Sequence, residues 1–330
     1  MVNDEVNLAD LFEAKSKIYS VVRRTPLKKS VALSKEIGSN IYYKCEFMQN
    51  TRSFKVRGAA NFILNLSEEQ RKRGVVTYST GNHGRAVAHI AKLLGSQAKV
   101  CLSNKVPENK RLGIKMAGGK LVVYGESQDE AQERAIELRD EEGLAVVAPF
   151  DDPYIIAGQG TIGLEIFDEL SVVDTVLVPL SGGGLASGVA MAVKSIKPDC
   201  RVIGVSMEDG AAMYASQEAG KPVQVEEVDS LADSLQGGIL LDNKYTFDMV
   251  KEYVDDIILV SEEEIERAMA YAFLKDHIVL EGAAAVGIAA LLEQKVSDVG
   301  ENVVTITSGS NVDNELFLSI VQKHRGDFKR

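Results

Sequence analysis

Apolar runs of strand length alternate with helical segments through most of the chain. VVTY at 75–78, VLVPL at 176–180 and VVTIT at 303–307 are short apolar runs. Residues 128–143 have helical spacing and end at glycine. Strands separated by crossover helices form parallel sheets with helices on both faces. The alternation therefore predicts an α/β fold with mostly parallel sheet.

The same pattern places further elements along the chain. It predicts strands within 98–103, 120–125, 144–149 and 201–207, and helices within 83–95, 108–119 and 181–196. Ser127 is the expected N-cap of the helix over 128–143. Residues 218–238 interrupt the alternation and are expected to be irregular.

Three predicted strands run into small, polar, glycine-rich loops. These loops read STGNHG at 79–84, SGGGL at 181–185 and SGSNVD at 308–313. Ligands of open α/β sheets bind beyond the carboxyl ends of the strands. We expect the three loops to lie along the same edge of a parallel sheet and to form a binding site there.

The loop SGGGL has the features of a phosphate site. Its glycines would expose backbone N–H groups at the start of a helix, where the helix dipole also favours an anion. No Gly-Lys-Ser/Thr follows, so it is not a Walker loop. A tight turn that needs only space is the alternative. GQGTIG at 158–163 matches a dinucleotide motif but follows FDDPYIIA, a poor central strand, so we expect a glycine-opened helix packed on the sheet.

Lys55 lies between Phe54 and Val56, where the sequence becomes small and apolar. Most lysines are exposed, and that is one interpretation here. A desolvated lysine, however, is the side chain that forms Schiff bases. A reactive amine, a phosphate loop and small polar loops are together the parts that pyridoxal 5'-phosphate (PLP) requires. Zinc and serine hydrolase motifs are absent from the sequence.

Composition excludes several other classes. The net charge of −11 over 330 residues disfavours nucleic acid and anionic membrane surfaces as partners. No apolar run reaches the roughly 20 residues of a spanning helix, and the polar start MVNDEVNLAD does not resemble a secretory signal. Three widely spaced cysteines suggest buried thiols in a reducing compartment. A cytoplasmic protein is expected.

Several motifs together resemble one family. The chain resembles the serine/threonine dehydratase and serine racemase group of fold-type II PLP enzymes in SFKVRGA, STGNHG, AGQGTIGLEI, PLSGGGLASG and TSGSNVD, which occur in the same order. The resemblance implies two open, mostly parallel twisted sheets flanked by helices. It also implies a large PLP-binding domain (1–68 and 150–330), a small mobile domain (69–149), a cofactor cleft between them and a homodimer.

The resemblance also implies site residues. Lys55 would form the Schiff base with PLP and then move the Cα proton, with Thr80 on the opposite face of the site. The remaining implied contacts are Phe54 against the cofactor ring, Asn82 at its 3-oxygen, Ser181, Gly182, Gly183, Gly184 and Leu185 at the phosphate, Ser308 at the pyridine nitrogen, and Ser79, Thr80, Gly81 and His83 at the substrate carboxylate.

The serine at position 308 limits the types of PLP reaction that we expect. A hydroxyl does not keep the pyridine protonated as a carboxylate would, so proton loss at Cα is best coupled to departure of a β substituent. We therefore expect a PLP-dependent ammonia-lyase that dehydrates a β-hydroxy amino acid and yields a 2-oxo acid. A serine or aspartate racemase on the same fold, and a non-catalytic phosphate-ligand binding protein, are the alternatives.

The chain departs from the family at a few positions. Racemase-type sites have a serine at the position of Thr80. The threonine in this chain favours dehydration over racemisation. Ser206 and Ala212 replace the oxygen ligands of the racemase cation site, so no metal is predicted. Because Arg330 follows soon after the Ser308 loop, we expect no regulatory domain of the kind found in biosynthetic threonine dehydratases.

The substrate has more than one interpretation. Arg52 and Arg85 could pair with a distal carboxylate, as in 3-hydroxyaspartate, or face solvent or another subunit. STGNHGRAVA and GVSMEDGAAM also resemble dehydratases of hydroxyectoine breakdown, which act on β-hydroxy diamino acids.

Overall fold

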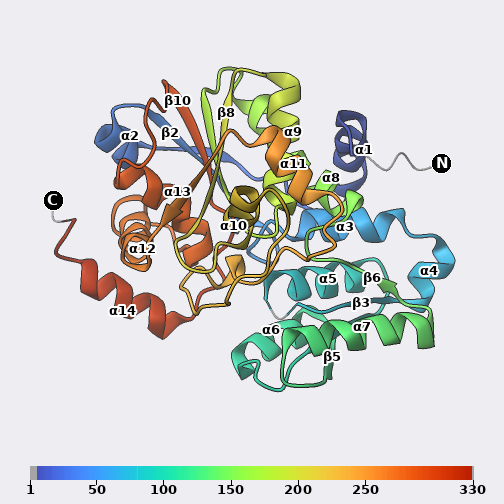
Figure 1. The fold of residues 1–330 in the computed structure, drawn as a ribbon. Helices are drawn as coiled ribbons and strands as arrows, with labels where there is room; N and C mark the ends of the chain where they lie inside the picture. The colour runs from blue at the N-terminus through green and yellow to red at the C-terminus, as the bar shows by residue number, and fades with distance from the viewer. Residues whose placement is uncertain (1–5, 80, 329–330) are drawn as a thin grey trace. The chain divides into compact units, whose positions relative to one another are not determined.

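The computed structural model describes residues 6–79 and 81–328, which form two compact units (Figure 1). The first unit contains the chain up to Arg23 and Gln49–Gln159, and the second contains Arg24–Met48 and the chain from Gly160 onward. Each unit has its own sheet. The expected α/β fold with two mostly parallel sheets is confirmed. Residues 69–149 contain all four strands of the first sheet, although that unit extends beyond them; a mobile domain with these bounds stays a prediction.

The first unit is built on a four-stranded parallel sheet in the order β5-β4-β3-β6. Its strands are β3 (Val75–Thr77), β4 (Ala98–Leu102), β5 (Lys120–Val123) and β6 (Ala145–Val146). Its helices are α1 (Leu8–Ile18), α3 (Val56–Asn65), α4 (Glu68–Arg73), α5 (Asn82–Leu93), α6 (Glu108–Ala117) and α7 (Gln128–Glu142), followed by the start of α8 (Pro153–Glu169).

Both faces of this sheet are covered. Val75 packs in an apolar cluster with α3 and α5, while the next residue, Val76, packs with Ala135 and Leu138 of α7. Successive strand residues point to opposite faces, so β3 contributes to two cores. This explains why its sequence is continuously apolar.

Ser127 caps α7 as expected. Its hydroxyl accepts a hydrogen bond from the Glu130 amide at 3.2 Å, and the Glu130 carboxylate accepts one from the Ser127 amide at 3.0 Å. This reciprocal pair satisfies two N–H groups that the helix itself leaves without acceptors. The prediction from the sequence is confirmed.

The second unit is built on a six-stranded sheet in the order β1-β2-β10-β7-β8-β9. Its strands are β1 (Leu27–Ser30), β2 (Asn40–Lys44), β7 (Thr175–Pro179), β8 (Arg201–Met207), β9 (Asp256–Val260) and β10 (Asn302–Ile306); β1 alone is antiparallel to its neighbour. Sequence periodicity missed β1, β2 and β9, because edge strands and polar residues weaken the apolar pattern. Residues 221–238 contain only the short turn η2 (Asp233–Leu235), in agreement with the expected irregular segment.

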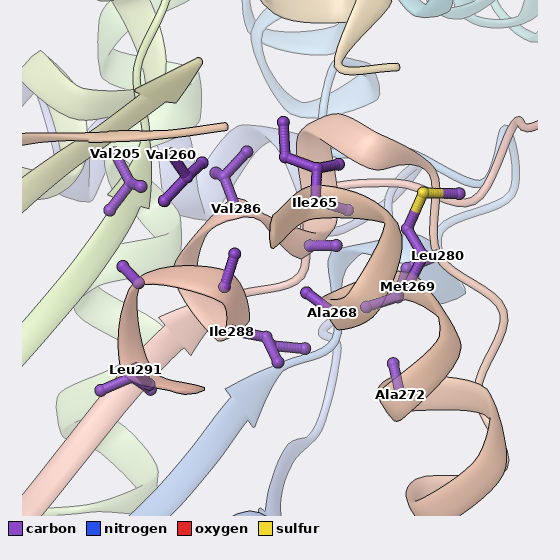
Figure 2. Packing of buried hydrophobic residues seen from close by; sticks show 14 of the residues in the cluster. Val205, Val260, Ile265, Ala268, Met269, Ala272, Leu280, Val286, Ile288 and Leu291 are labelled. Atoms are coloured by element: carbon purple, nitrogen blue, oxygen red, sulfur yellow. The ribbon is translucent and has the colours of Figure 1, made fainter. Parts of the chain in front are cut away.

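Helices supply the rest of the second core. They are α2 (Val31–Ile37), α9 (Gly184–Ile196), α10 (Ala212–Ala219), α11 (Thr246–Tyr253), α12 (Glu262–Asp276), α13 (Gly282–Leu292) and α14 (Asn314–His324). Residues 282–291 of α13 are all buried, and α13 packs on α12 and on four strands. Figure 2 shows Val286 and Ile288 of α13 beside Ile265 and Ala268 of α12. A helix that is apolar on every side belongs in a core.

The motif GQGTIG lies in the interior of α8, so the expected glycine-opened helix is wrong. The helix begins five residues earlier, where the Asp152 carboxylate accepts from the Tyr154 and Ile155 amides at 2.8 and 3.1 Å. Two of its glycines, Gly158 and Gly163, allow close contact with other helices. A Cβ on Gly158 would lie 2.7 Å from the Gly58 Cα, and one on Gly163 would lie 2.6 Å from the Ala192 Cβ.

The three glycine-rich loops do not share one sheet edge. The loops after β7 and β10 leave neighbouring strands of the second sheet, whereas the loop after β3 leaves the sheet of the first unit. The expectation of a single edge is therefore wrong. Apolar runs identify strands but do not determine which strands pair, because pairing depends on long-range contacts.

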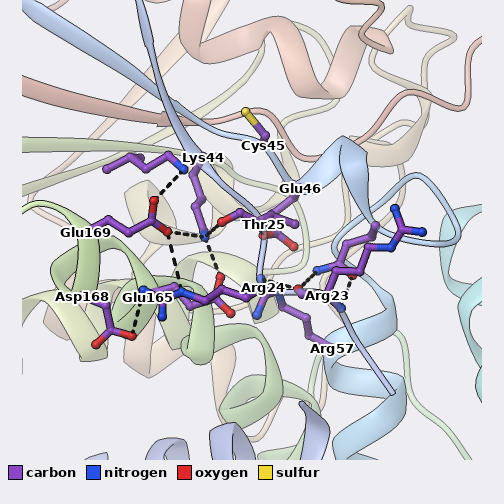
Figure 3. Close-up of polar contacts among 12 residues, drawn as sticks. Arg23, Arg24, Thr25, Lys44, Cys45, Glu46, Arg57, Glu165, Asp168 and Glu169 are labelled. Carbon is purple, nitrogen blue, oxygen red and sulfur yellow. Dashed lines mark hydrogen bonds and ion pairs between the residues drawn. The ribbon is translucent and has the colours of Figure 1, made fainter. Parts of the chain in front are cut away.

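A buried ion pair joins β2 to α8 within the second unit (Figure 3). The Lys44 ammonium lies 2.5 Å from the Glu165 carboxylate, and neither side chain is exposed. Lys44 also donates to the Thr25 carbonyl at 2.6 Å. Nothing in the sequence pattern predicted this pair. Among the described residues, no helix has the length and apolar character needed to span a membrane.

Candidate active site

Lys55 is the N-cap residue of α3, where the sequence predicted a helix to begin. Its side chain is half-buried, and its amine donates a hydrogen bond to the Pro149 carbonyl at 2.7 Å. The amine also lies 5.3 Å from the centre of the Phe54 ring. Burial lowers the pKa of Lys55 from 10.5 to about 8, because a desolvated ammonium loses its hydration. A substantial fraction of this amine is therefore neutral and nucleophilic near physiological pH.

Asn82 and His83 begin α5 directly after the loop that follows β3. The His83 imidazole is buried, and its Nε2 lies 3.1 Å from the Val147 carbonyl, so Nε2 carries the proton and donates. Burial, followed by the positive charge of Lys55, lowers the pKa of His83 to about 3. His83 is therefore a neutral side chain and not a general acid. A lysine and a histidine of two separate motifs are thus held by one segment after β6.

The first turn of α5 depends on glycine. A Cβ on Gly84 would lie 2.2 Å from the Ser79 carbonyl oxygen, so no other residue fits there without a shift. Gly81 is the N-cap of α5, and Ser79 is half-buried. Thr80 lies outside the described residues. Gly81 and Asn82 of the predicted substrate-carboxylate loop thus lie at a helix N-terminus, a position that favours anions.

The glycine loop after β7 forms the N-terminus of α9. Gly183 is the N-cap, with a φ of 91°, and Gly184 begins the helix. A Cβ on Gly183 would lie 2.8 Å from the Thr246 Cβ and 2.9 Å from the Met213 Cε. Both the backbone angle and the space therefore require glycine. Ser181 is half-buried, whereas Gly182 and Leu185 are buried. The backbone amides at the start of a 13-residue helix suit a phosphate.

Ser308 follows β10 and is 3% exposed. The strand ahead of it is anchored, since the Thr307 amide and hydroxyl both donate to the Lys44 carbonyl, at 3.1 and 3.0 Å. After it, Gly309 lies against Glu281: an added Cβ would be 2.5 Å from a Glu281 carboxylate oxygen. Glu281 also accepts from the Asn311 amide at 2.8 Å.

Glu281 lies against the loop after Ser308, and the sequence analysis did not single it out. Its signal, a glutamate just before the apolar run of α13, is visible in the sequence. Nothing in the apolar run of α13, however, indicates that Glu281 contacts the loop after Ser308, about 30 residues later in the chain.

The predicted residues fall into two sets. Phe54, Lys55, Ser79, Gly81, Asn82 and His83 belong to the first unit, and Ser181, Gly182, Gly183, Gly184, Leu185 and Ser308 belong to the second. Each set fits part of PLP. The first offers a desolvated amine, and the second offers a glycine cradle at a helix N-terminus and a buried hydroxyl. The residues present therefore fit this cofactor.

Other chemistries have little support in the described residues. Cys45, Cys101 and Cys200 are buried free thiols, as expected, and burial raises the pKa of each to about 11. Within residues 6–79 and 81–328, no cluster of three His, Cys, Asp or Glu residues could hold a metal ion. Glu208, near the racemase cation position, instead lies 3.4 Å from the Lys295 amine.

The two arginines discussed for the substrate differ in environment. Arg52 is exposed and has a φ of 58°. Arg85 is half-buried on α5, and its guanidinium lies over Gly113 of α6, where an added Cβ would be 2.5 Å from the Arg85 Nε. Arg85 therefore packs between helices of the first unit.

A lysine with a lowered pKa and a glycine loop at a helix N-terminus, on this α/β fold, are features of a PLP-dependent enzyme. The profile of the family described as "Pyridoxal-phosphate dependent enzyme" matches residues 18–309, so the chain belongs to this family. The expected cofactor class is confirmed.

Similar proteins place the chain within the family. It is 42% identical to an L-threonine ammonia-lyase of Thermotoga maritima, over 96% of this chain and 79% of the relative. It is 43% identical to a catabolic L-threonine dehydratase of Staphylococcus aureus, over 93% and 90%. The structure of maize serine racemase superposes with a TM-score of 0.91 at 32% identity, covering 98% of both chains. The chain thus belongs to the threonine dehydratase and serine racemase group that its motifs indicated.

Proposed function

We propose that the protein is a PLP-dependent threonine ammonia-lyase, which converts L-threonine to a 2-oxo acid and ammonia. The observation that carries this proposal is the Lys55 amine, whose pKa burial lowers to about 8 at the N-terminus of α3. The similarity to L-threonine ammonia-lyase and L-threonine dehydratase over more than nine-tenths of this chain supports the substrate.

PLP, when bound, would supply an aldehyde for the amine and withdraw electrons from the substrate Cα. Lys55 would hold the cofactor, then take the proton from Cα of the substrate. Amides of Gly182, Gly183 and Gly184 would bind the phosphate, and Ser308 would hydrogen-bond the ring nitrogen. Asn82 would donate to the ring oxygen, with Phe54 beside the ring.

The turn before α5 would hold the substrate carboxylate. Ser79, Thr80, Gly81 and His83 would contribute through hydroxyls and backbone amides, since the His83 imidazole already donates to Val147. The helix N-terminus adds favourable potential for an anion. The site would thereby orient the Cα–H bond toward Lys55.

Ser308 favours elimination over transamination. A neutral hydroxyl does not stabilise a protonated pyridine, whereas a carboxylate would raise the pKa of the ring nitrogen. Charge at Cα is then best relieved by loss of the β-hydroxyl as water. The resulting enamine takes up water and releases ammonia, so threonine yields 2-oxobutanoate.

A racemase is the second candidate, because the maize serine racemase superposes so closely. Thr80, in place of a racemase serine, has a stiffer side chain and weakens that assignment. A non-catalytic binder is disfavoured by the depressed pKa of Lys55. We also propose a homodimer, a cytoplasmic location and movement of a small domain at 69–149. The alternative substrates are of the 3-hydroxyaspartate or hydroxy-diamino acid type.

A substrate panel tests this function. L-Threonine, L-serine, 3-hydroxyaspartate and a hydroxy-diaminobutyrate are supplied separately, and ammonia, 2-oxo acid and D-isomer are each measured. We expect ammonia and 2-oxobutanoate from L-threonine, and neither from a Lys55→Ala variant. Accumulation of a D-isomer without oxo acid would instead establish the racemase.

A further inference from the structure

The helix that carries Lys55 begins without a cap of its own. Helix N-termini leave backbone N–H groups without intrahelical acceptors, and a Ser, Thr, Asp or Asn usually accepts from them. The N-cap of α3 is Lys55, whose side chain makes no capping hydrogen bond and whose amine instead donates to the Pro149 carbonyl. The ammonium of a lysine side chain has no acceptor atom, so the Gly58 amide in the first turn needs an acceptor from another residue.

Gln159 of α8 provides this acceptor. Its Oε1 accepts a hydrogen bond from the Gly58 amide at 3.3 Å, in the first turn of α3. Gln159 is 1% exposed, so water does not compete for this amide. A Cβ on Gly58 would lie 2.5 Å from the Gln159 Nε2. Glycine at 58 is thus what allows the glutamine side chain to approach the helix end.

The two helices meet closely at this point. A Cβ on Gly158 would lie 2.7 Å from both the Arg57 carbonyl oxygen and the Gly58 Cα. Backbone is therefore in contact with backbone one residue from Gln159. Gln159 and the first turn of α3 are therefore closely packed, so a change at Gln159 is expected to displace that turn.

We propose that Gln159 is a positioning residue that caps α3 from α8 and thereby places Lys55 for reaction with PLP. Lys55 is then held at both ends by one stretch of chain. Gln159 holds its backbone through the first turn of the helix, and the carbonyl of Pro149, four residues before α8, holds its amine. This inference rests on the proposed role of Lys55 as the point of PLP attachment.

Other α3–α8 contacts provide a comparison. The Asn61 side chain donates to the Tyr154 carbonyl at 2.8 Å, and the Phe62 and Tyr154 rings meet edge to face at 6.2 Å. These contacts lie further along α3, away from Lys55. If Gln159 only holds the helices together, loss of the Asn61 contact should have the same consequence as loss of the Gln159 contact.

The experiment measures covalent attachment of PLP to the cofactor-free full-length protein. The rate is followed by absorbance as a function of pH, and borohydride trapping with peptide mass mapping locates the modified lysine. Gln159→Leu removes the acceptor at similar volume. Gln159→Glu keeps the acceptor oxygen and adds a charge. Asn61→Ala is the matched control, and thermal unfolding is recorded for every variant.

We expect the high-pH plateau of the attachment rate to fall about tenfold or more in Gln159→Leu, because small displacements of a reacting group have large effects. Gln159→Glu should restore that plateau with its midpoint moved to higher pH, since a nearby carboxylate raises the pKa of a lysine. Asn61→Ala should keep the wild-type plateau despite a lower melting temperature. Should Gln159→Leu not fold, Gly58→Ala, which crowds the glutamine, takes its place.

Equal plateaus for Gln159→Leu and Asn61→Ala, or an unchanged plateau in Gln159→Leu or Gly58→Ala, would overturn the proposal. Failure of the proposed function has a different signature. In that case the wild-type protein itself would show no modified Lys55.

Discussion

Lys55 and His83 are held by carbonyl groups two residues apart in the chain. The Lys55 amine donates to the Pro149 carbonyl at 2.7 Å, and His83 Nε2 donates to the Val147 carbonyl at 3.1 Å. Both side chains are desolvated, and the pKa of each is lowered, to about 8 and about 3. The same segment therefore holds two basic residues from separate motifs, and burial lowers the pKa of both.

The rate of PLP attachment should depend on one ionisation with a midpoint near pH 8. The neutral amine reacts and burial lowers the pKa of Lys55 to about 8, so the rate rises with pH through this region. His83, with a pKa of about 3, stays neutral and adds no second step between about pH 5 and 8. The measurement is the second-order rate of attachment against pH. A midpoint near 10.5, the ordinary value for lysine, would contradict the desolvated environment.

The free energy of unfolding of the cofactor-free protein should also depend on the lowered pKa of Lys55. The unfolded chain binds more protons at position 55 between pH 8 and 10.5, because its lysine has the higher pKa. Lys55 therefore makes the free energy of unfolding increase with pH in this window. Urea unfolding at several pH values should show a steeper increase for wild type than for Lys55→Met. Parallel curves would argue against a shifted pKa.

Gly183→Ala should weaken PLP binding. The added Cβ would lie 2.8 Å from the Thr246 Cβ, at a residue whose φ is 91°. A distortion of about 1.4 kcal/mol raises Kd about tenfold, and we expect at least that effect in an absorbance titration with PLP. Gly220→Ala is the control, because Gly220 has a φ of 69° but nothing within 4 Å of the added Cβ. If both variants bind PLP equally, the tight packing at Gly183 has no role in binding.

The Lys44–Glu165 pair should respond differently to single and double replacement. Lys44→Met leaves a buried carboxylate without its cation and should lower the free energy of unfolding by about 3–5 kcal/mol. Lys44→Met combined with Glu165→Leu removes both charges, and most of that stability should return. Urea denaturation of the two variants and the wild type provides the comparison. A double variant less stable than Lys44→Met would show that the glutamate has a more important partner than the lysine.

Ser308→Asp should divert the reaction from elimination. A carboxylate beside the ring nitrogen would raise the pKa of that nitrogen and stabilise charge at Cα without loss of the hydroxyl. We expect ammonia release from L-threonine to fall about tenfold or more, a change of about 1.4 kcal/mol in the barrier, while α-proton exchange in deuterated water is retained. Ser308→Asn, similar in size but uncharged, is the control. Equal behaviour of the two variants would assign the effect to size.

Local rules accounted for several elements. Ser127 could be identified as a cap because serine is a preferred N-cap residue directly before a helical segment. The strand over Val75–Thr77 and the glycine loop after β7 were likewise recognisable from residues adjacent in sequence. Lys55 was singled out because a lysine at an apolar helix start is unusual, and the motif resemblance then assigned its role.

Long-range contacts were beyond these rules. Glu281 beside Gly309, Gln159 beside Gly58 and Lys44 beside Glu165 each join residues roughly 30 to more than 100 positions apart. Their individual side chains carry no sign of the partner. GQGTIG was expected to open a helix because it follows a poor strand sequence, whereas Gly158 and Gly163 lie inside α8 and allow helices to touch.

The sequence alone determined the alternation of strands and helices, the glycine loops and the lysine with its motif, because these depend on neighbouring residues and on short apolar periods. Only the tertiary structure decided which strands share a sheet, what surrounds the Lys55 amine and which distant carbonyl or carboxylate meets each loop. The physical reason is that desolvation and buried hydrogen bonds are properties of the packed chain. The same lysine in an unfolded segment would be hydrated and protonated.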